Sequence, residues 1–403
     1  MDGAFAALTN RNFRLYFTAK CVSHVGTWMQ RVAQDYLVLH LGGGGTALGI
    51  TVAVQFAPTA LGGVHAGVWV DRLAHRRRAM AAEQVAAAML AVLLAVVALA
   101  GGVVWQVYLL AAGLGLCTVV SNPLQQALLA EIVDGPLRSS AVALNSAAFT
   151  GGRVVGSALA GVVIAGLGVA AACWANAVSF TAVLVALAAM RREEMHPAPP
   201  VPRMPGQARA GLAYLAQRRD LGMLFAVTGI ASVLLMPFQT VLVPLLVVDT
   251  FGAGATGLGI AGAALAAGAV VGQLAAGRRP PQPSSTMIWT AAAGVLLAAA
   301  ATAPRYEVFV VVLLAASAPA FGWGVLAQGY LHRAVDRAFT GRVTAVWFTL
   351  ASGSNLLGPP LAGGLASLLG PRTALALCGA GTALAVTVLA AFPPFRTTTE
   401  EIP

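Results

Sequence analysis

Four ionisable residues lie in one otherwise apolar stretch near the start of the chain. Lys20, His24, Arg31 and Asp35 follow one another at steps of 4, 7 and 4 residues, which place all four on one face of a helix. An ionisable group in hydrocarbon costs about 2.5 kcal/mol or more, so each needs a partner or a purpose. We expect Lys20 to reach the membrane surface with its long side chain. His24 is interpreted either as a hydrogen-bonded packing residue or as a proton-coupling candidate.

Arg31 and Asp35 are the more informative pair. They could form a structural ion pair along the helix, or Asp35 could carry a proton, because burial favours the neutral acid and a nearby arginine favours the carboxylate. Arg31 does not release its proton and can only tune Asp35 or bind an anion. Asp35 lies 22 residues after Phe13, so a gate near the outer end of the helix is a further interpretation.

Arg153 lies in a later apolar stretch that holds no acid. Its partner must come from elsewhere in the chain, and Asp35 is the candidate because it is an acid that could pair with the guanidinium. Such an arginine would bind an anionic part of a ligand or hold helices together. Other residues in apolar stretches are candidates for lining a cavity or for hydrogen bonds between helices: Gln30, Gln55, Gln125, Gln126, Asn145, Asn176, Gln239, Trp323, Gln328 and Asn355.

These residues belong to a very apolar chain. Of its 403 residues, 58% are hydrophobic and 9% are charged, and the mean hydropathy is +0.80, whereas about a quarter of a soluble domain is charged. The composition excludes a soluble enzyme and indicates a membrane protein. The four cysteines, Cys21, Cys117, Cys173 and Cys378, are isolated, so we expect reduced packing residues and no metal site. No nucleotide-binding loop or nucleophile triad occurs, so we expect no enzyme and no cofactor.

A helix needs about 20 apolar residues to cross a bilayer, and twelve stretches meet that requirement. They lie at 13–40, 47–70, 80–100, 104–128, 140–166, 169–190, 221–248, 256–277, 286–303, 307–330, 342–368 and 373–392. The sequence therefore predicts an all-α polytopic membrane protein of twelve transmembrane helices, in two six-helix bundles at 1–190 and 221–403. Between them, 191–220 is charged and proline-rich. We expect a cytoplasmic linker there, with a short amphipathic helix at the membrane surface or a simple tether.

The arginines predict the orientation of these spans. If the loops between spans are numbered from the N-terminus, nineteen arginines lie at the termini or in the even-numbered loops. Only Arg305 and Arg372 lie in the odd-numbered loops, on the other side of the membrane. The positive-inside rule then places both termini in the cytoplasm. The net charge of +10 is therefore a topology signal, and we expect no nucleic-acid partner.

The second half of the chain repeats the first. A shift of 202 residues aligns 126–168 with 328–370 and gives twelve identities in 43 positions, against roughly four expected from so biased a composition. Asp134 matches Asp336, and Gly168 matches Gly370. Since the two halves have the same topology, we expect an axis along the membrane normal to relate them, with a binding site between them near the midplane.

Residues 67–78 read GVWVDRLAHRRR, which resembles the signature loop of the major facilitator superfamily. Ala74 stands where that family usually has a second glycine. Gly67 permits close helix approach, and Asp71 can accept hydrogen bonds from a helix N-terminus or pair with an arginine. The resemblance implies that this loop locks the two halves together when the protein faces outward. The candidate lock residues are Gly67, Asp71, Arg72, Arg76 and Arg77.

Three further segments narrow the resemblance. Residues 10–15, 26–33 and 145–161 are similar to the branch of the superfamily that contains macrolide-efflux and enterobactin-exporter proteins. Residues 152–161, GRVVGSALAG, resemble a motif of proton-coupled exporters, although Ser157 replaces the usual proline and Ala160 a glycine. The alternative is ordinary small-residue packing. The second half of the chain repeats this motif at 358–363, and together the two copies give the packing candidates Gly152, Gly156, Gly161, Gly358, Pro359 and Gly363.

These features predict a secondary active transporter that exports a small amphipathic molecule, such as a drug, secondary metabolite or siderophore, against proton entry by alternating access. The alternatives are an importer or uniporter on the same fold, or a membrane scaffold or sensor without transport. We expect the proton gradient as energy source, the lipid bilayer and a small molecule as partners, and a monomer. The expected location is the plasma or inner membrane of a bacterium.

Overall fold

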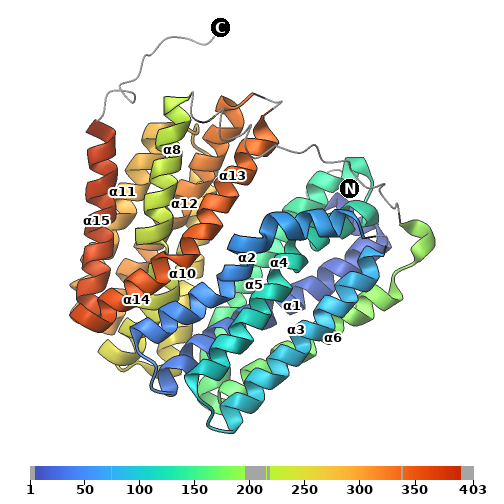
Figure 1. The fold of residues 1–403 in the computed structure, drawn as a ribbon, viewed down its shortest axis with the longest axis horizontal. Coiled ribbons are helices and arrows are strands. Elements are labelled where there is room, and N and C mark those ends of the chain that lie inside the picture. Colours follow the sequence, from blue (N-terminus) through green and yellow to red (C-terminus); the bar gives the residue numbers. More distant parts are fainter. Residues whose placement is uncertain (1–4, 74, 196–214, 216–217, 337–338, 392–403) are drawn as a thin grey trace.

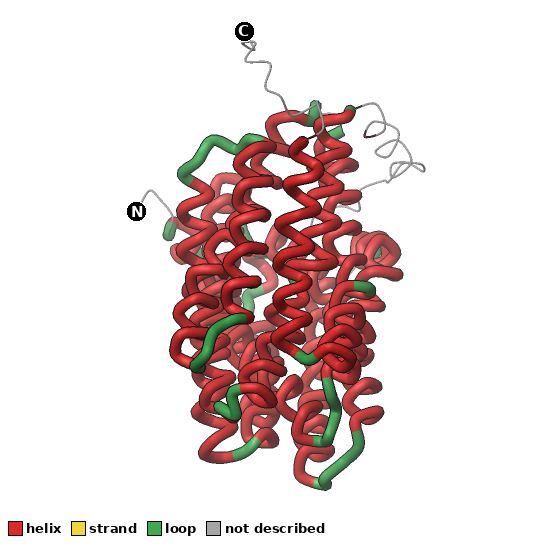
Figure 2. Tube along the Cα trace, turned by 90° about the vertical axis from the view of Figure 1, so that its left-hand side faces the viewer, coloured by secondary structure: helices red, strands yellow, loops and turns green. Residues whose placement is uncertain are grey.

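The chain folds into a bundle of long helices. The computed structural model describes residues 5–73, 75–195, 215, 218–336 and 339–391, and every regular element within them is helical (Figure 2). The first six long helices, called the N half, are α1 (Arg11–His40), α2 (Gly45–Asp71), α3 (Arg76–Leu99), α4 (Val104–Ile132), α5 (Arg138–Leu167) and α6 (Val169–Ala189). The C half contains α8 (Arg219–Ile230), α9 (Val243–Leu245), α10 (Gly254–Gly277), α11 (Pro283–Ala301), α12 (Tyr306–Ala334), α13 (Thr340–Gly353), α14 (Gly358–Leu369) and α15 (Pro371–Ala391).

Helices occur at all twelve predicted spans, which confirms the predicted all-α fold. Ten described helices are long and apolar enough to cross a membrane. The other two predicted spans are helical as well. The first of them is α1, whose polar face lowers its hydropathy. The second, predicted at 342–368, is divided into α13 and α14 by a 3-10 turn, η7 (Ser354–Leu356). The amphipathic helix predicted within 191–220 falls almost entirely outside the described residues.

The first membrane-spanning helix of the C half, residues 219–250, is not a regular α-helix, and we call it the π-wound rod. After α8 it continues through three π-helical segments, η4 (Ala231–Leu235), η5 (Phe238–Leu242) and η6 (Leu246–Thr250), with α9 between the last two. The Met236 amide donates to the Ala231 carbonyl at 2.8 Å, five residues back. Pro237 and Pro244 explain the widening, because proline lacks an amide hydrogen and its ring displaces the carbonyl four residues earlier. Such turns are rare and frequently mark functional sites.

The two halves lean together at one end and diverge towards the end that carries both termini (Figure 1). They pack through α2 against α14 and through α5 against α10. A Cβ on Gly363 would overlap the carbonyl group of Gly45, and a Cβ on Gly259 would lie 2.6 Å from the Cα of Gly161. Both contacts therefore need glycine on each side, as in other close helix crossings.

Hydroxyl groups complete this closed end. The Thr46 hydroxyl donates to the Ser367 Oγ at 2.9 Å, and the Thr46 amide donates to the same atom at 3.1 Å. These bonds join the start of α2 in the N half to the end of α14 in the C half. Neither residue is charged, and the side chains of Leu245 and Ala366 lie beside Gly45 at the same end, so these contacts are made by uncharged groups.

The repeat seen in the sequence is present in the backbone. Gly168 ends α5 and Gly370 ends α14, and both have a φ of +85°. They are related by the same shift of 202 residues that aligns the two halves. An L-amino acid is strained in this conformation, which explains why both copies keep glycine.

Replacing Gly168 with alanine should lower the free energy of unfolding by about 1–3 kcal/mol, because only glycine adopts this backbone region without strain. No atom lies within 4 Å of the added methyl group, so strain is the sole cost. Denaturant titration of the purified protein measures it. Gly166→Ala is the matched control, since Gly166 is helical and equally unobstructed and alanine favours helix. Equal losses for the two variants would contradict the explanation.

Candidate functional site

A cavity of about 430 Å³ lies between the two halves, and we call it the interface cavity. The N half contributes α1, α2 and α5, and the C half contributes the π-wound rod, α10, α12, α13 and η7. Its aromatic residues are Trp28, Phe56, Phe149, Phe321, Trp323 and Trp347. Its polar residues are Arg31, Asp35, Arg153, Ser157, Ser232, Gln239, Thr240 and Asn355. The predicted candidates Arg153, Trp323 and Asn355 thus come together with Arg31 and Asp35.

Arg153 bridges the halves inside the interface cavity. Its guanidinium carbon lies 5.1 Å from the ring centroid of Trp28 in the N half and 4.4 Å from that of Phe321 in the C half. Its Nη2 donates to Oε1 of Gln239 at 2.7 Å. Asp35 is therefore not its partner, contrary to our expectation, because two rings and an amide satisfy the guanidinium. A desolvated cation–π contact contributes about 2 kcal/mol, so Arg153 links the halves without a direct acidic partner.

Arg31 and Asp35 face the same cavity but do not form an ion pair. The Arg31 guanidinium lies over the Phe56 ring, 5.5 Å from its centroid. Asp35 is 6% exposed, and its Oδ1 has no hydrogen-bond partner in the described part of the chain. The structural ion pair that the spacing suggested is thus absent, since Arg31 turns to an aromatic ring instead. Asp35 remains a buried acid at the edge of a cavity.

A second cavity, of about 350 Å³, lies within the N half, and we call it the N-half cavity. Trp28, Arg31, Phe56 and Phe149 line both cavities, so the two adjoin. Carboxamides are the largest group among its polar residues: Gln30, Gln34, Gln55, Gln84, Asn122, Gln125 and Asn176. The ionisable side chains that line it are Lys20, His24, Arg31, Glu83 and Cys117.

Two of these ionisable residues differ from expectation. Lys20 is 5% exposed and lines the N-half cavity, so the predicted position at the membrane surface is wrong. The cavity offers the ammonium group polar surroundings without a long reach. Glu83, from α3, was not predicted as a site residue. His24 packs edge-on against Phe149 with ring centroids 5.4 Å apart, and its Nε2 has no hydrogen-bond partner among the described residues.

Hydrogen bonds between carboxamides hold the walls of the N-half cavity. Asn176 donates to Gln30 at 2.7 Å, which ties α6 to α1, and Gln34 donates to Gln55 at 3.3 Å, which ties α1 to α2. Asn145 accepts from Gln125 at 3.1 Å. Asn145 lines neither of the two cavities, so its position favours a hydrogen bond between α4 and α5 over the predicted role in a cavity.

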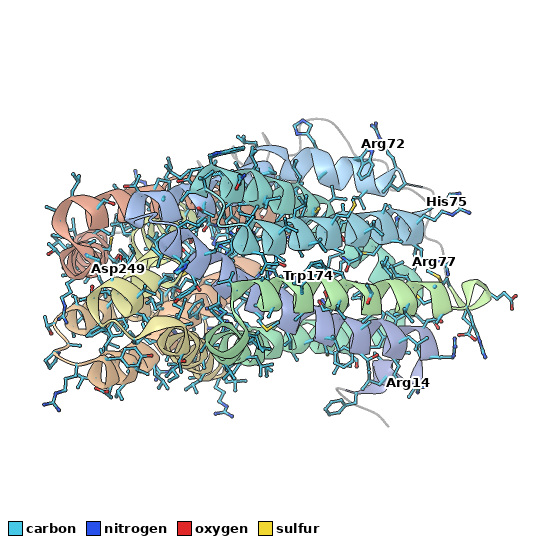
Figure 3. The ribbon with its side chains drawn as sticks, turned by 90° about the horizontal axis from the view of Figure 1, so that it is seen from below. Arg14, Arg72, His75, Arg77, Trp174 and Asp249 are labelled. Carbon is cyan, nitrogen blue, oxygen red and sulfur yellow. The ribbon has the colours of Figure 1, made fainter. Side chains whose placement is uncertain are left out.

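Residues 67–78, predicted as a signature loop, include the end of α2 and the start of α3, at the end of the molecule where the halves diverge. Arg76 begins α3 and forms an ion pair with Glu131 of α4 at 2.7 Å. Arg77 donates to the Met190 carbonyl at 3.3 Å. Arg72 is exposed, and Figure 3 shows it at the same end as Arg77, His75 and Arg14. Gly67 and Asp71 lie in the last turns of α2, and the side chain of Asp71 is outside the described set.

The pair of Arg76 and Glu131 yields a stability prediction. Both side chains are nearly buried, at 8% and 12% exposed, so Arg76→Met should lower the free energy of unfolding by about 3–5 kcal/mol by leaving a buried carboxylate unpaired. Adding Glu131→Gln should restore part of the loss. Arg78→Met, at an exposed neighbour, is the control and should change little. A double variant as unstable as the sum of both single losses would contradict the pairing.

The small residues of the packing motif serve two kinds of contact. Gly152 and Gly156 lie against α1, beside His24 and Val25, and Gly358 lies against the π-wound rod. Gly161 and Gly363 contact the opposite half, at Gly259 and Gly45, and Pro359 packs on Gly49 of α2. The motif and its repeat copy therefore pack α5 and α14 within their own halves and also against α10 and α2 of the opposite halves.

Comparisons with known proteins agree with this geometry. Residues 2–401 match the model of the family described as transmembrane secretion effector, MFS_3. No curated protein sequence matches the chain.

Solved transporter structures share the fold. A bacterial homologue of the human lysosomal transporter Spinster, inward-facing and unoccupied, has a TM-score of 0.72 at 14% identity, with 94% of this chain and 96% of that chain covered. The nucleoside transporter NupG has a TM-score of 0.73 at 10% identity, with 94% and 98% covered. A POT family transporter in complex with a thioalcohol-conjugated peptide has 0.71 at 11% identity, with 95% and 96% covered.

Proposed function

The chain belongs to the transmembrane secretion effector family of major facilitator type transporters, and we propose that it exports a small amphipathic molecule in exchange for protons. It is a multi-pass membrane transporter and not an enzyme. The proposal concerns the direction of transport, the coupling ion and the class of substrate.

The interface cavity is the observation that carries this proposal. It is lined by both halves, it combines six aromatic rings with a few polar groups, and pockets of this character bind small molecules. Arg153, Trp28 and Phe321 connect the halves across it. A ligand that enters must compete with these contacts, so binding and the relative movement of the halves are coupled.

The position of the closed end supports alternating access. With the termini in the cytoplasm, as the positive-inside rule requires, the glycine contacts between α2 and α14 close the outer side. On this proposed orientation the structure would correspond to the inward-facing state, which takes substrate from the cytoplasm or the inner leaflet. Rocking the halves about the cavity would open the other side.

Asp35 is the proposed proton carrier. It is buried, it lines the interface cavity and it makes no direct ion pair, so a proton can neutralise it and a substrate can change its surroundings. The word secretion in the family's description and the small-residue motif of residues 152–161 both favour export over import. Arg31 and His24 are proposed to tune this site.

The remaining assignments follow from the same reasoning. We retain two six-helix domains at 1–190 and 221–403, joined by a cytoplasmic linker at 191–220. The protein would act as a monomer in a bacterial plasma membrane, with the gradient as its energy source and no further cofactor. Resemblance to the macrolide-efflux and enterobactin-exporter branch suggests drugs or siderophores as substrates.

Transport assays test the proposal. Cells with and without the protein are first compared for sensitivity to a panel of macrolides, siderophores and amphipathic dyes. Compounds that distinguish them are then added to everted vesicles with an acidic lumen, where an exporter accumulates the compound and a protonophore abolishes the accumulation. Flux that ignores the protonophore would indicate a uniporter. No flux with any compound would indicate a scaffold or sensor.

A further inference from the structure

The N-half cavity contains two opposite charges that do not pair directly with each other. Lys20 from α1 and Glu83 from α3 both line it, and Nε2 of Gln84 donates a hydrogen bond to Oε2 of Glu83 without neutralising its charge. No direct ion pair joins them in the described structure. Charges inside a membrane protein normally pair with one another or with backbone. Two opposite charges that face one cavity therefore suggest that something in the cavity contacts both.

Some buried polar atoms at this cavity have no hydrogen-bond partner among the described residues. Nε2 of His24 and Oε1 of Gln84 are buried without one in the described chain, and both residues line the cavity. His24 is 9% exposed and Gln84 is 2% exposed. Native proteins leave few buried polar atoms unsatisfied, and each one needs an explanation. A bound hydrogen-bonding group would satisfy both atoms.

The remaining groups around the cavity restrict its ligand. The other titratable or charged side chains that line it are Arg31 of α1, which turns to Phe56, and Cys117 of α4. The other polar residues are carboxamides and hydroxyls, several tied to each other. A singly charged ligand would bring an opposite charge to Lys20 or to Glu83 but not to both, and an uncharged ligand would bring one to neither, so each choice leaves a charge in the cavity without a counter-charge.

We propose that the N-half cavity binds a zwitterionic head group, with its anionic group against Lys20 and its amine against Glu83. Trp28 and Phe149 line both cavities, so the apolar part of the same molecule would lie in the aromatic interface cavity. This inference rests on the proposed function for its role in transport and narrows the substrate to an amphipathic zwitterion. The binding step can be measured without transport.

Four soluble probes that share one aromatic group test the site in purified protein. L-Phenylalanine is the zwitterion, phenethylamine the cation, hydrocinnamate the anion and phenethyl alcohol the uncharged probe. Calorimetry should show phenylalanine binding about tenfold more tightly than the others, since a tenfold ratio corresponds to about 1.4 kcal/mol. Lys20→Met should lower the affinity for phenylalanine to that for phenethylamine, and Glu83→Gln should lower it to that for hydrocinnamate. Glu307→Gln, at an exposed acid of α12, is the matched control and should preserve the order.

The sequence provides a second readout that needs no substitution. Lys20 is the only lysine in the chain, so reductive methylation with an isotope label gives a single side-chain amine signal by NMR. Phenylalanine and hydrocinnamate should shift this signal, and phenethylamine should not. This measurement, together with Glu83→Gln, still decides the matter if Lys20→Met fails to fold.

Three results would overturn the zwitterion site: equal affinity for all four probes, no binding of any probe, or a lysine signal that none of them moves. The outcome is separate from that of the export assay. Charge-selective binding without flux would refute export and leave the site in place. Flux of another compound without charge selectivity would refute the site and leave export in place.

Discussion

Asp35→Asn should reduce gradient-driven accumulation in everted vesicles to the level reached without a gradient. Asparagine keeps the shape of the side chain and does not take up or release a proton. Asp35 makes no ion pair or hydrogen bond in the described structure, so the replacement breaks no contact and the protein should fold normally. Transport down a substrate gradient should persist, because binding and rocking do not require the proton.

The matched control for this experiment is Asp249→Asn. Asp249 is an exposed acid of the C half, far from the cluster of labelled arginines in Figure 3, and its replacement should leave accumulation unchanged. Export that still follows the proton gradient in the Asp35 variant, at normal expression, would remove Asp35 as the carrier. Glu83 would then be the next acid to test, since it is the other one lining the two cavities.

Gly363→Val should prevent the closed end from forming and leave the protein inactive. A Cβ at this position overlaps the backbone carbonyl group of Gly45, and backbone in a helix does not yield as a flexible side chain does. The α2 and α14 helices must therefore separate, and the state seen in the structure loses stability. Each 1.4 kcal/mol of this loss changes the ratio of the two states about tenfold.

Thiol labelling measures the change directly. Leu245→Cys, in a background with the four native cysteines replaced, reports on the closed end because Leu245 is 1% exposed and lies beside Gly45 there. Gly363→Val should increase its reaction rate with a membrane-impermeant maleimide about tenfold or more. Gly364→Val is the neighbouring control, since no atom lies within 4 Å of a Cβ added there. Unchanged labelling and export in the Gly363 variant would mean that this contact is not needed for transport.

Much of the fold was predictable because membrane helices are recognised from the length and hydropathy of their sequence segments. Even the span that holds Lys20 and Asp35, whose polarity lowers its hydropathy, is predictable from its length and the spacing of its polar residues. Gly161 and Gly363 were predictable as packing residues from their four-residue spacing and the repeat. The sequence did not indicate that they contact the opposite half, because this depends on how each helix is rotated.

The charged partners were harder to predict for the same reason. Arg76 pairs with Glu131 from another helix, and Arg153 finds Trp28 and Phe321 in place of an acid. Neither arrangement has a signal in local spacing. Glu83 lacks a basic residue one helical turn away within α3's apolar part, so only the packing of α1 against α3 and α4 reveals that it shares a cavity with Lys20.

The contrast between the two ends of the molecule has a consequence for its response to ionic strength. The contacts described at the closed end, among them those of Gly45 with Gly363 and of Thr46 with Ser367, are made by uncharged residues, so salt should hardly affect that end. The other end carries exposed arginines on both halves, including Arg72, Arg78, Arg278, Arg279 and Arg333. Bringing that end together concentrates like charge, and salt weakens the resulting repulsion because the screening length falls to about 8 Å at physiological ionic strength. Added salt, or anionic lipid headgroups at that surface, should therefore favour the state in which the arginine-rich end closes, making the surrounding electrolyte a regulator of which way the transporter faces.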